Sequence, residues 1–415
     1  MAKLPLEGIR VADFSWVWAG PYCTLQLAHL GAEVIRIETK TRPCVTRILP
    51  PWPEDSKPGS LNESGYFNQY NQGKKSLSLN FNHPEAKEVA WRLIKSADIV
   101  ANNFAASVMD KMGFGYEAIR TVKPDIIMIS LLGYGDSGPY RDYVALGPTQ
   151  VPNSGLSALT SYEGWPPMSA GFSYPDPNAG VHGSFAVMAA LHHRARTGEG
   201  QFIDMSQWEC TMDLLAEGIL EYTMNGREPR RIGNRDPQMS PHGIFKCLDL
   251  PEKILNTTID RWVAIACADD EEWRRLAHAI GRHELADDAR FATLAARKQN
   301  ENALEAIITE WTSKRRVADV VTALQAAGVA AGACADNKYL HDDPNLAARN
   351  YWVELNHPEV GVKRHCGIPW RMSATPCEVK SPAPLLGQHT DELMTGLLGY
   401  TAAEVEALRK KGALD

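Results

Sequence analysis

One carboxylate, Asp176, is placed where it could do chemistry. It lies in the stretch 174–183, Tyr-Pro-Asp-Pro-Asn-Ala-Gly-Val-His-Gly, directly before Pro177 and ahead of the apolar run 185–191. Asp is a favoured N-cap residue and Pro a favoured first residue of a helix, so the stretch is typical of a helix start. A carboxylate nucleophile held at the mouth of a helix would have the same pattern. Local sequence alone favours the simple helix start.

Other catalytic motifs are absent from the sequence or incomplete. No Gly-x-Ser-x-Gly, Walker A or His-Glu-x-x-His sequence occurs. Gly133-Tyr-Gly-Asp-Ser-Gly138 matches Gly-x-Gly-x-x-Gly after a predicted strand, but Pro139 follows at once, where a dinucleotide fingerprint would open a helix. We therefore expect no NAD(P) site there, although a glycine-rich bend can bring a backbone close to a ligand.

The distribution of Cys and His indicates no metal site. The eight cysteines are scattered and none forms a Cys-x-x-Cys pair, so neither zinc nor an iron–sulfur cluster is expected. His192 and His193 are expected at a helix end or on the surface. Because the N-terminal residues have no apolar signal segment, the thiols are expected to be reduced and the protein cytoplasmic.

Length and charge limit the class of protein. A chain of 415 residues predicts two domains. A formal charge of −7, without long runs of Lys and Arg, argues against a nucleic-acid partner. No stretch approaches 18 uninterrupted apolar residues, so no membrane span is expected.

The order of predicted elements is typical of an α/β domain. Residues 9–15 are predicted as a buried strand, a helix opens at Pro21 and ends at Gly31, and residues 32–38 form the next strand. Such a unit predicts a parallel pair with a right-handed crossover. The pattern repeats with strands 77–79, 98–101 and 125–132 and helices 84–96, 108–112 and 116–122. We therefore predict a Rossmann-like parallel-sheet domain, with the Pro-rich segment 39–64 as a surface loop.

The rest of the chain predicts a smaller α+β domain and a return to the first one. The predicted elements are helices from Asp176 to about His193 and over 207–223, 271–280, 304–311 and 317–328, strands 202–206, 262–266 and 329–333, and a last helix opened by the capping box Thr401 to Glu404. We assign residues 1–224 to the large domain, 225–325 to the small domain with its linkers, and 326–415 to the completion of the large domain.

Two indoles stand close together on the loop after the first predicted strand. Trp16 and Trp18 would face the same way if the chain between them were extended. They could pack in a core, or they could offer a flat wall to an adenine or other aromatic ring. The sequence favours neither role over the other.

Several segments together resemble the family III CoA-transferases, which include formyl-CoA:oxalate and carnitine CoA-transferases. They occur in family order along nearly the whole chain. The segments are 8–14 (Gly-Ile-Arg-Val-Ala-Asp-Phe), 19–21, 30–38, 71–76, 97–100, 103–104, 109–114, 133–135, 154–156, Asp176-x-x-x-Gly180, 197–201 and 386–390.

The resemblance implies two interlocked ring-like subunits with the active site at the dimer interface. It implies that Asp176 is the catalytic aspartate and that Lys40 and Lys111 can pair with CoA phosphates. The residues matching CoA-contacting positions are Trp18, Ala19, Thr39, Lys40, Leu79, Asn80, Phe81, Asn82, Asn103, Phe104, Ala105, Lys111, Leu131, Leu132, Gly133 and Tyr134. Coenzyme A is then the only cofactor, as part of the substrate, and no metal is needed.

Three departures narrow the activity. Formyl-CoA transferases resemble this chain but carry Gln in place of Trp18 and a run of glycines in place of 233–239, which argues against formyl-CoA and oxalate. The related α-methylacyl-CoA racemases carry a His where this chain has Gly147 and Pro148. A transferase is therefore favoured over a racemase, which stays an alternative together with a CoA-binding partner subunit.

The expected reaction moves CoA from an acyl-CoA donor to a carboxylic acid through an aspartyl anhydride and an aspartyl-CoA thioester. An Asp with an ordinary pKa is ionised at pH 7, and a helix N-terminus would change that little. Gly133–Gly135 or the loop at Gly233 could supply oxyanion donors. Candidate loops are rich in aromatic residues: Trp16, Trp18, Trp52, Tyr66, Tyr70 and Trp165.

These aromatic loops favour an aromatic acceptor such as an arylsuccinate, with succinyl-CoA as donor. The chain also looks similar to benzylsuccinate CoA-transferase subunits. That resemblance implies a role in aromatic degradation, and either a homodimer or a heteromer with a related subunit.

Overall fold

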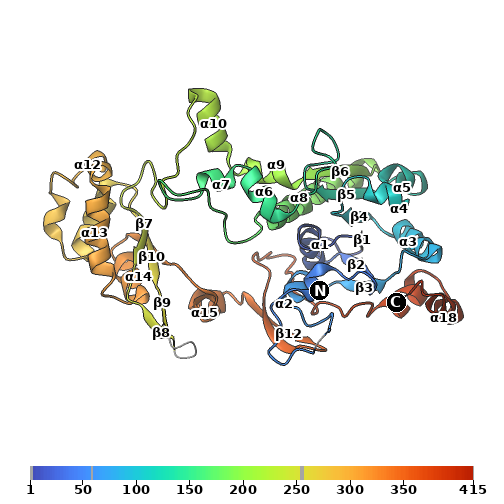
Figure 1. The fold of residues 1–415 in the computed structure, drawn as a ribbon. Coiled ribbons are helices and arrows are strands. Elements are labelled where there is room, and N and C mark those ends of the chain that lie inside the picture. Colours follow the sequence, from blue (N-terminus) through green and yellow to red (C-terminus); the bar gives the residue numbers. More distant parts are fainter. Residues whose placement is uncertain (1–2, 58, 253–256, 415) are drawn as a thin grey trace. The chain divides into compact units, whose positions relative to one another are not determined.

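The computed structural model describes residues 3–57, 59–252 and 257–414. The chain divides into two compact units. The first unit comprises Met1–Ala158, Met168–Pro229 and Asn345–Asp415, and the second comprises Leu159–Pro167 and Arg230–Pro344. Figure 1 labels many of the helices and strands of both units.

A parallel sheet forms the centre of the first unit, as the sequence predicts. Its six strands lie in the order β3-β2-β1-β4-β5-β6, and every neighbouring pair is parallel. The strands are β1 (Arg10–Asp13), β2 (Glu33–Glu38), β3 (Lys75–Ser78), β4 (Ile99–Asn102), β5 (Ile127–Leu132) and β6 (Gln201–Ser206). The hairpin of β12 (Trp352–His357) and β13 (Gly361–Cys366), which the sequence did not reveal, belongs to the same unit.

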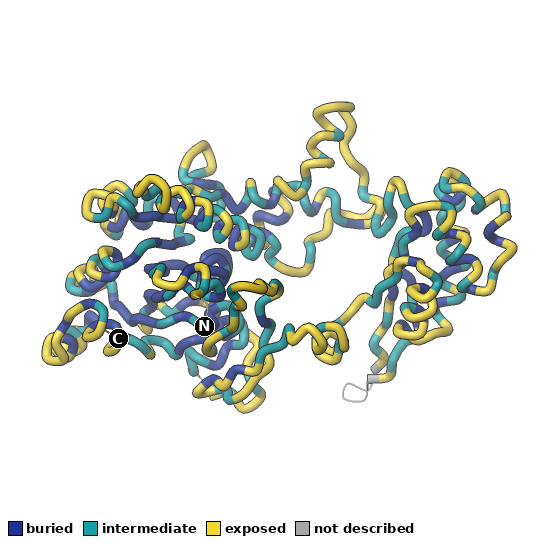
Figure 2. The backbone as a smooth tube through the Cα atoms, turned by 180° about the vertical axis from the view of Figure 1, so that it is seen from behind, coloured by how far each residue is buried: buried dark blue, intermediate teal, exposed yellow. Residues whose placement is uncertain are grey.

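Helices cover both faces of this sheet, because successive side chains of a strand point to opposite faces. Val11 packs in one core with the helices α1 and α8, and Ala12 packs in the other with α3, α4, α5 and α18. The buried strands and exposed outer helix surfaces are visible in Figure 2. The helices are α1 (Ala19–His29), α2 (Gly65–Tyr70), α3 (Pro84–Ser96), α4 (Val108–Met112), α5 (Tyr116–Val122), α6 (Gly147–Asn153), α8 (Pro175–Thr197), α9 (Gln207–Asp213), α10 (Ala216–Asn225), α17 (Thr390–Glu392) and α18 (Ala402–Lys410).

A buried carboxylate, Glu38, joins three distant segments of this unit. It lies at the end of β2 and receives two hydrogen bonds from Arg47, at 2.9 and 2.7 Å. Arg36 approaches it from the same strand at 3.3 Å. Arg47 also donates to the carbonyl of Pro384, far along the chain. The segment 39–64 is largely exposed, as the sequence predicts, but it is anchored to the unit through a fully buried arginine.

A second buried ion pair is linked to the first. Lys74 lies 3.3 Å from Asp13, at the end of β1. The side-chain oxygen of Asn71 accepts from both Lys74, at 3.1 Å, and Arg36, at 2.9 Å. The ends of β1 and β2 are thus held by one connected set of charges.

The second unit has its own sheet and core. Its antiparallel sheet has the order β11-β10-β7, and Trp273 of α11 is fully buried in its core. The elements are β7 (His242–Lys246), β8 (Leu250–Glu252), β9 (Thr257–Ile259), β10 (Trp262–Ala266), β11 (Ala330–Ala333), α11 (Asp270–Ala279), α12 (Leu294–Gln299), α13 (Glu301–Thr312), α14 (Val317–Ala326) and α15 (Asn337–His341). The short strands β7, β8 and β9 were not predicted.

One predicted helix was wrong in its extent. The expected single helix over 207–223 is two helices, α9 and α10, separated at Leu214 and Leu215. The first ends in a tight turn in which the Leu214 N–H bonds to the carbonyl of Thr211. None of the helices built from described residues has the length and apolar composition that crossing a membrane requires.

Candidate active site

Asp176 lies in the first turn of α8, but it is not the N-cap residue. The helix begins at Pro175 and its N-cap is Tyr174. Pro175 rather than Pro177 takes the first helical position, where the missing N–H costs nothing. The expected N-cap role of Asp176 is therefore wrong, and its side chain is directed by the helix rather than by capping.

The Asp176 carboxylate is held at the N-terminal ends of two helices. The hydroxyl of Ser173 and the backbone N–H of Ala19, the first residue of α1, both favour its ionised form and lower its pKa. The first N–H groups of a helix have no partner within it and favour an anion. Ser173 has no sequence signal of its own, and it was not predicted.

Gly147, the first residue of α6, lies against this carboxylate. A Cβ atom at this position would be 2.3 Å from Asp176 Oδ2 and 2.2 Å from Ser173 Oγ. Only a glycine leaves room for both side chains. The glycine beside Asp176 is thus Gly147, whereas Gly133 packs against Ala145 and Gln150.

The helices α1 and α8 approach closely because α8 presents small residues. A Cβ on Gly180 would be 3.0 Å from the carbonyl oxygen of Ala19, and one on Gly183 would be 3.1 Å from Cys23 Sγ. These glycines follow Asp176 at helical spacings of four and seven, so all three share one face of α8. The close packing brings the N-terminus of α1 to the carboxylate.

Burial changes the acidity of Asp176. Loss of solvent raises the pKa of Asp176 to about 6. The interactions with Ser173 and Ala19 lower this pKa, but by less than burial raises it. The expectation of an ordinary pKa is therefore wrong, because desolvation outweighs the two helix N-termini. At pH 7 the carboxylate is still mostly ionised.

An aromatic wall, defined as Trp18, Tyr66, Tyr70 and Phe172, borders the carboxylate. The Trp18 ring centroid lies 5.7, 5.2 and 6.3 Å from those of Tyr66, Tyr70 and Phe172. Burial and, next, the charge of Asp176 raise the pKa of Tyr66. The wall therefore lies within electrostatic reach of the nucleophile candidate.

The two neighbouring indoles have different surroundings. Val17 between them has a φ of 62°, so the chain is not extended there. Trp16 lies 6.0 Å from Phe104 and under the guanidinium of Arg42, whereas Trp18 joins the aromatic wall. They do not form the single flat surface that an extended chain would give.

A cavity of about 670 Å³ opens at the carboxyl ends of β1 and β4. The chain leaves these two neighbouring strands toward opposite edges of the sheet, and this switch point is where α/β sheets bind ligands. Predicted CoA contacts that line it are Thr39, Leu79, Asn80, Phe81, Asn82, Phe104 and Ala105, together with Trp16 and Arg42. Asn80 is fixed by residues 412–413, since it donates to the carbonyls of Gly412 and Ala413 at 3.1 and 3.0 Å.

The other predicted CoA contacts lie elsewhere. Lys40 is exposed next to Thr39, and Lys111 is exposed on α4 between Val108 and Met112, which line the cavity. Trp18 and Ala19 lie beside Asp176, and Asn103 is bonded to the Trp16 backbone. Leu131 is buried in the core, and Leu132 lines a smaller neighbouring cavity. Gly133 packs against Ala145, and the Tyr134 ring lies among those of Tyr140, Tyr143 and Trp208.

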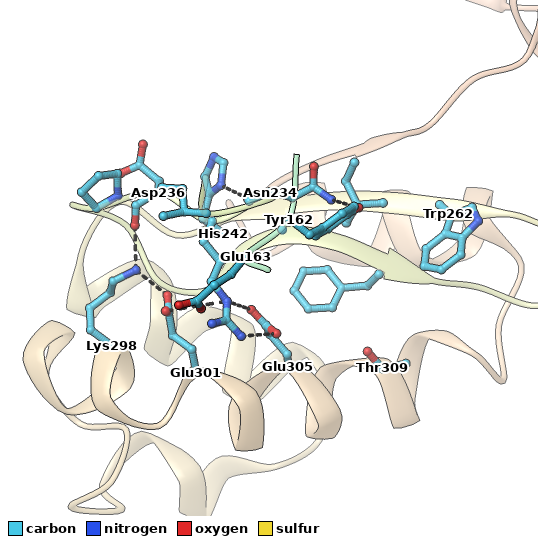
Figure 3. Close-up of a pocket in the computed structure, with 16 residues that line it drawn as sticks. Tyr162, Glu163, Asn234, Asp236, His242, Trp262, Lys298, Glu301, Glu305 and Thr309 are labelled. Carbon is cyan, nitrogen blue, oxygen red and sulfur yellow. Dashed lines mark hydrogen bonds and ion pairs between the residues drawn. The ribbon is translucent and has the colours of Figure 1, made fainter. Parts of the chain in front are cut away.

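The segment 233–239 is fastened within the second unit beside a cavity of about 690 Å³. Arg235 makes two hydrogen bonds to Glu305, at 2.7 and 2.8 Å. Lys298 donates to the Asp236 carbonyl at 2.7 Å, and Asn234 donates to the Tyr162 hydroxyl at 3.0 Å (Figure 3). Within the described ranges, no three His, Cys, Asp or Glu side chains are arranged to hold a metal ion.

Comparison with known proteins agrees with this fold. Residues 6–390 match the model of CoA-transferase family III. The chain is 33% identical over 395 residues to the succinate–glutarate CoA-transferase of Agrobacterium fabrum, covering 95% of this chain and 96% of that protein. It is 31% identical over 407 residues to the succinyl-CoA–D-citramalate CoA-transferase of Chloroflexus aurantiacus, covering 98% and 97%.

The crystal structure of a CAIB/BAIF family protein from Brucella suis superposes with a TM-score of 0.84 at 30% identity, covering 96% of this chain and 100% of that one. The chain therefore belongs to CoA-transferase family III and is an enzyme of that family.

The acidity of Asp176 predicts the acid side of the pH profile. A carboxylate that attacks a thioester must be ionised, so kcat/KM for acyl-CoA should fall tenfold per unit below a midpoint near pH 6. Ser173→Ala removes a hydrogen bond that lowers the pKa, so its midpoint should move to higher pH. Ser184→Ala, elsewhere on α8, should leave it unchanged. A midpoint near pH 3.8 in the parent would contradict this prediction, because it would show that burial does not raise the pKa of Asp176 above its ordinary value.

Proposed function

We propose that this enzyme transfers CoA from succinyl-CoA to a carboxylic acid, with Asp176 as covalent nucleophile. The observation that carries the proposal is the carboxylate itself. It is desolvated, held by Ser173 and Ala19, pressed against Gly147 and bordered by the aromatic wall. The two relatives named above act with succinate or succinyl-CoA, which supports this donor.

The chemistry needs no external base. Asp176 attacks the thioester carbonyl, which gives an aspartyl–succinyl anhydride and CoA thiolate. The thiolate attacks the aspartyl carbonyl, releasing succinate and leaving an aspartyl-CoA thioester. The acceptor carboxylate then displaces the thiolate, and the thiolate attacks the acceptor carbonyl of the new anhydride. One thioester is broken and one is formed, and Asp176 is regenerated.

The surroundings of Asp176 suit these steps. Burial removes water that would stabilise the free carboxylate, so the anion is more reactive than an exposed one. The Ser173 hydroxyl and the Ala19 N–H both favour the ionised form of the carboxylate. The negative charge that develops on the thioester carbonyl oxygen during attack would lie near the N-terminus of α1, where helix N–H groups stabilise an anion.

For CoA itself we propose the cavity at the ends of β1 and β4. Trp16 and Phe104 give it an apolar wall, and Lys40 and Lys111 lie next to residues that line it. Lysine is a suitable point charge for a phosphate. The predicted contacts at Leu131 and Leu132 would then be made through the backbone, since both side chains are buried.

For the acceptor we propose a bulky acid with an aromatic body, such as an arylsuccinate. The aromatic wall offers flat apolar surface within reach of Asp176. The enzyme would then serve aromatic degradation in the cytoplasm, as a homodimer or as a heteromer with a related subunit. A racemase is disfavoured because Gly147 stands in place of the expected His.

Covalent catalysis predicts a trappable adduct. After incubation with succinyl-CoA, the intact parent protein should gain mass at Asp176, and hydroxylamine should trap it. Asp176→Asn and Asp176→Ala should show no adduct, with kcat lower by on the order of 10³-fold or more.

The folded-state pKa of Asp176 lies above its ordinary value, so the ionised group costs stability at pH 7, and Asp176→Asn should melt no lower than the parent. Near-normal exchange in either variant would exclude the nucleophile. Solvent deuterium entering the acyl-CoA without an acceptor would indicate a racemase.

The CoA cavity predicts a KM effect. Lys40→Ala and Lys111→Ala should each raise KM for acyl-CoA about threefold to tenfold with little change in kcat, since each removes one contact to a phosphate. Lys95→Ala, exposed on α3, is the matched control. An unchanged KM in the double variant would place the phosphates elsewhere.

The aromatic wall predicts the acceptor preference. With succinyl-CoA as donor, arylsuccinates should be used with higher kcat/KM than glutarate, citramalate or mesaconate. Tyr70→Ala should weaken the aryl preference more than the activity with small acids. A screen without preference for aryl acids would remove this part of the proposal.

A further inference from the structure

The backbone at Val17 is strained at the point where the cavity and the nucleophile meet. Val17 has a φ of 62°, in the left-handed region that β-branched residues avoid. Trp16 before it lines the cavity, and Trp18 after it belongs to the aromatic wall. Such a conformation persists only where the surroundings determine it.

Two side chains hold the strained residue from different sides. Asn103 accepts from the Trp16 N–H and donates to the Trp16 carbonyl, both at 2.7 Å. The buried Cys44 thiol accepts the Val17 N–H at 3.2 Å. Cys44 is itself fixed by the Thr46 hydroxyl at 3.1 Å. The Trp16–Val17 backbone is thus bonded to the loop after β4 and to the loop after β2.

The strained turn sets the start of α1. The Trp18 carbonyl accepts the Tyr22 N–H at 2.7 Å, so the helix is fixed from Trp18 onward. Ala19 comes next; it packs against Gly180, one helical turn after Asp176 on α8, and its N–H lowers the pKa of the Asp176 carboxyl. Without the left-handed Val17, the chain would enter α1 at another angle, and the Ala19 N–H would leave the carboxylate.

We infer that Asn103 and Cys44 are positioning residues of the transfer reaction, which act through the left-handed Val17 to hold the Ala19 N–H on Asp176. The inference rests on the proposed role of Asp176 as nucleophile. It gives the Cys44 thiol a role as a hydrogen-bond acceptor, without any redox or nucleophilic step.

The test compares variants at Cys44. Cys44→Ala removes the acceptor, and we expect kcat about fivefold lower, the loss of one hydrogen bond. We also expect the acid midpoint of kcat/KM to move to higher pH, because the Ala19 N–H lowers the pKa of Asp176. Cys44→Ser keeps an acceptor and should retain the parent values. Cys247→Ala, an equally buried thiol in the second unit, controls for lost packing.

Rescue at Val17 separates positioning from stability. Glycine adopts a positive φ without strain, so Val17→Gly combined with Cys44→Ala should recover kcat and the acid midpoint of the parent. Melting temperatures show that each variant is folded. If Cys44→Ala does not fold, Asn103→Ala gives the same midpoint readout from the other side of the turn.

Three results would overturn the inference: an unchanged kcat and midpoint in Cys44→Ala, equal loss in Cys44→Ser, or no recovery in the double variant. Asp176→Asn is assayed in parallel. Near-parent exchange in Asp176→Asn would overturn the proposed function itself, whereas an inactive Asp176→Asn beside an unaffected Cys44→Ala would overturn only the positioning role.

Discussion

The ion pair between Glu38 and Arg47 fixes the segments on which the site depends. Both side chains are almost fully buried. Burial alone would raise the pKa of Glu38, but the guanidinium groups of Arg47 and Arg36 hold this pKa at about 2. Because this folded-state pKa is depressed, the stability it gives is complete above the ordinary value of 4.5 and is lost only as pH falls toward 2. The stability that this pair gives is therefore still present near pH 6, where the pKa of Asp176 lies.

This pair also explains why a Pro-rich loop can carry part of an active site. The segment after β2 contributes Cys44 to the Val17 turn, and α2 contributes Tyr66 and Tyr70 to the aromatic wall. Loops are usually the mobile parts of a domain. Here Arg47 fastens the loop to the sheet and to the carbonyl of Pro384. Removing one partner of such a buried pair lowers the free energy of unfolding by about 3–5 kcal/mol, because the other charge stays buried without a partner.

The sequence predicted elements well where local signals suffice. The helices at Val108–Met112 and Tyr116–Val122 and the strand Trp262–Ala266 have the predicted bounds, since Gly113, Pro124 and an apolar run mark them. Strands such as β7 and β13 are short and mixed in polarity, and only pairing with distant partners makes them strands. Asp176 became a candidate through segments in family order. The contacts of Gly147, Ser173 and Cys44 were not predicted, because they cross the fold and leave no local pattern.

The contact between Asn80 and residues 412–413 makes one wall of the cavity depend on a segment that is synthesised late. Asn80 lines the cavity at the ends of β1 and β4, and its backbone and side chain are held by carbonyls more than 300 residues later in the chain. Ala413 and Leu414 are themselves buried in the core of the first unit. On the ribosome, this wall of the cavity stays unsupported until residue 414 has left the exit tunnel. The strands that surround the cavity are thus synthesised long before the carbonyls that hold Asn80 in its wall.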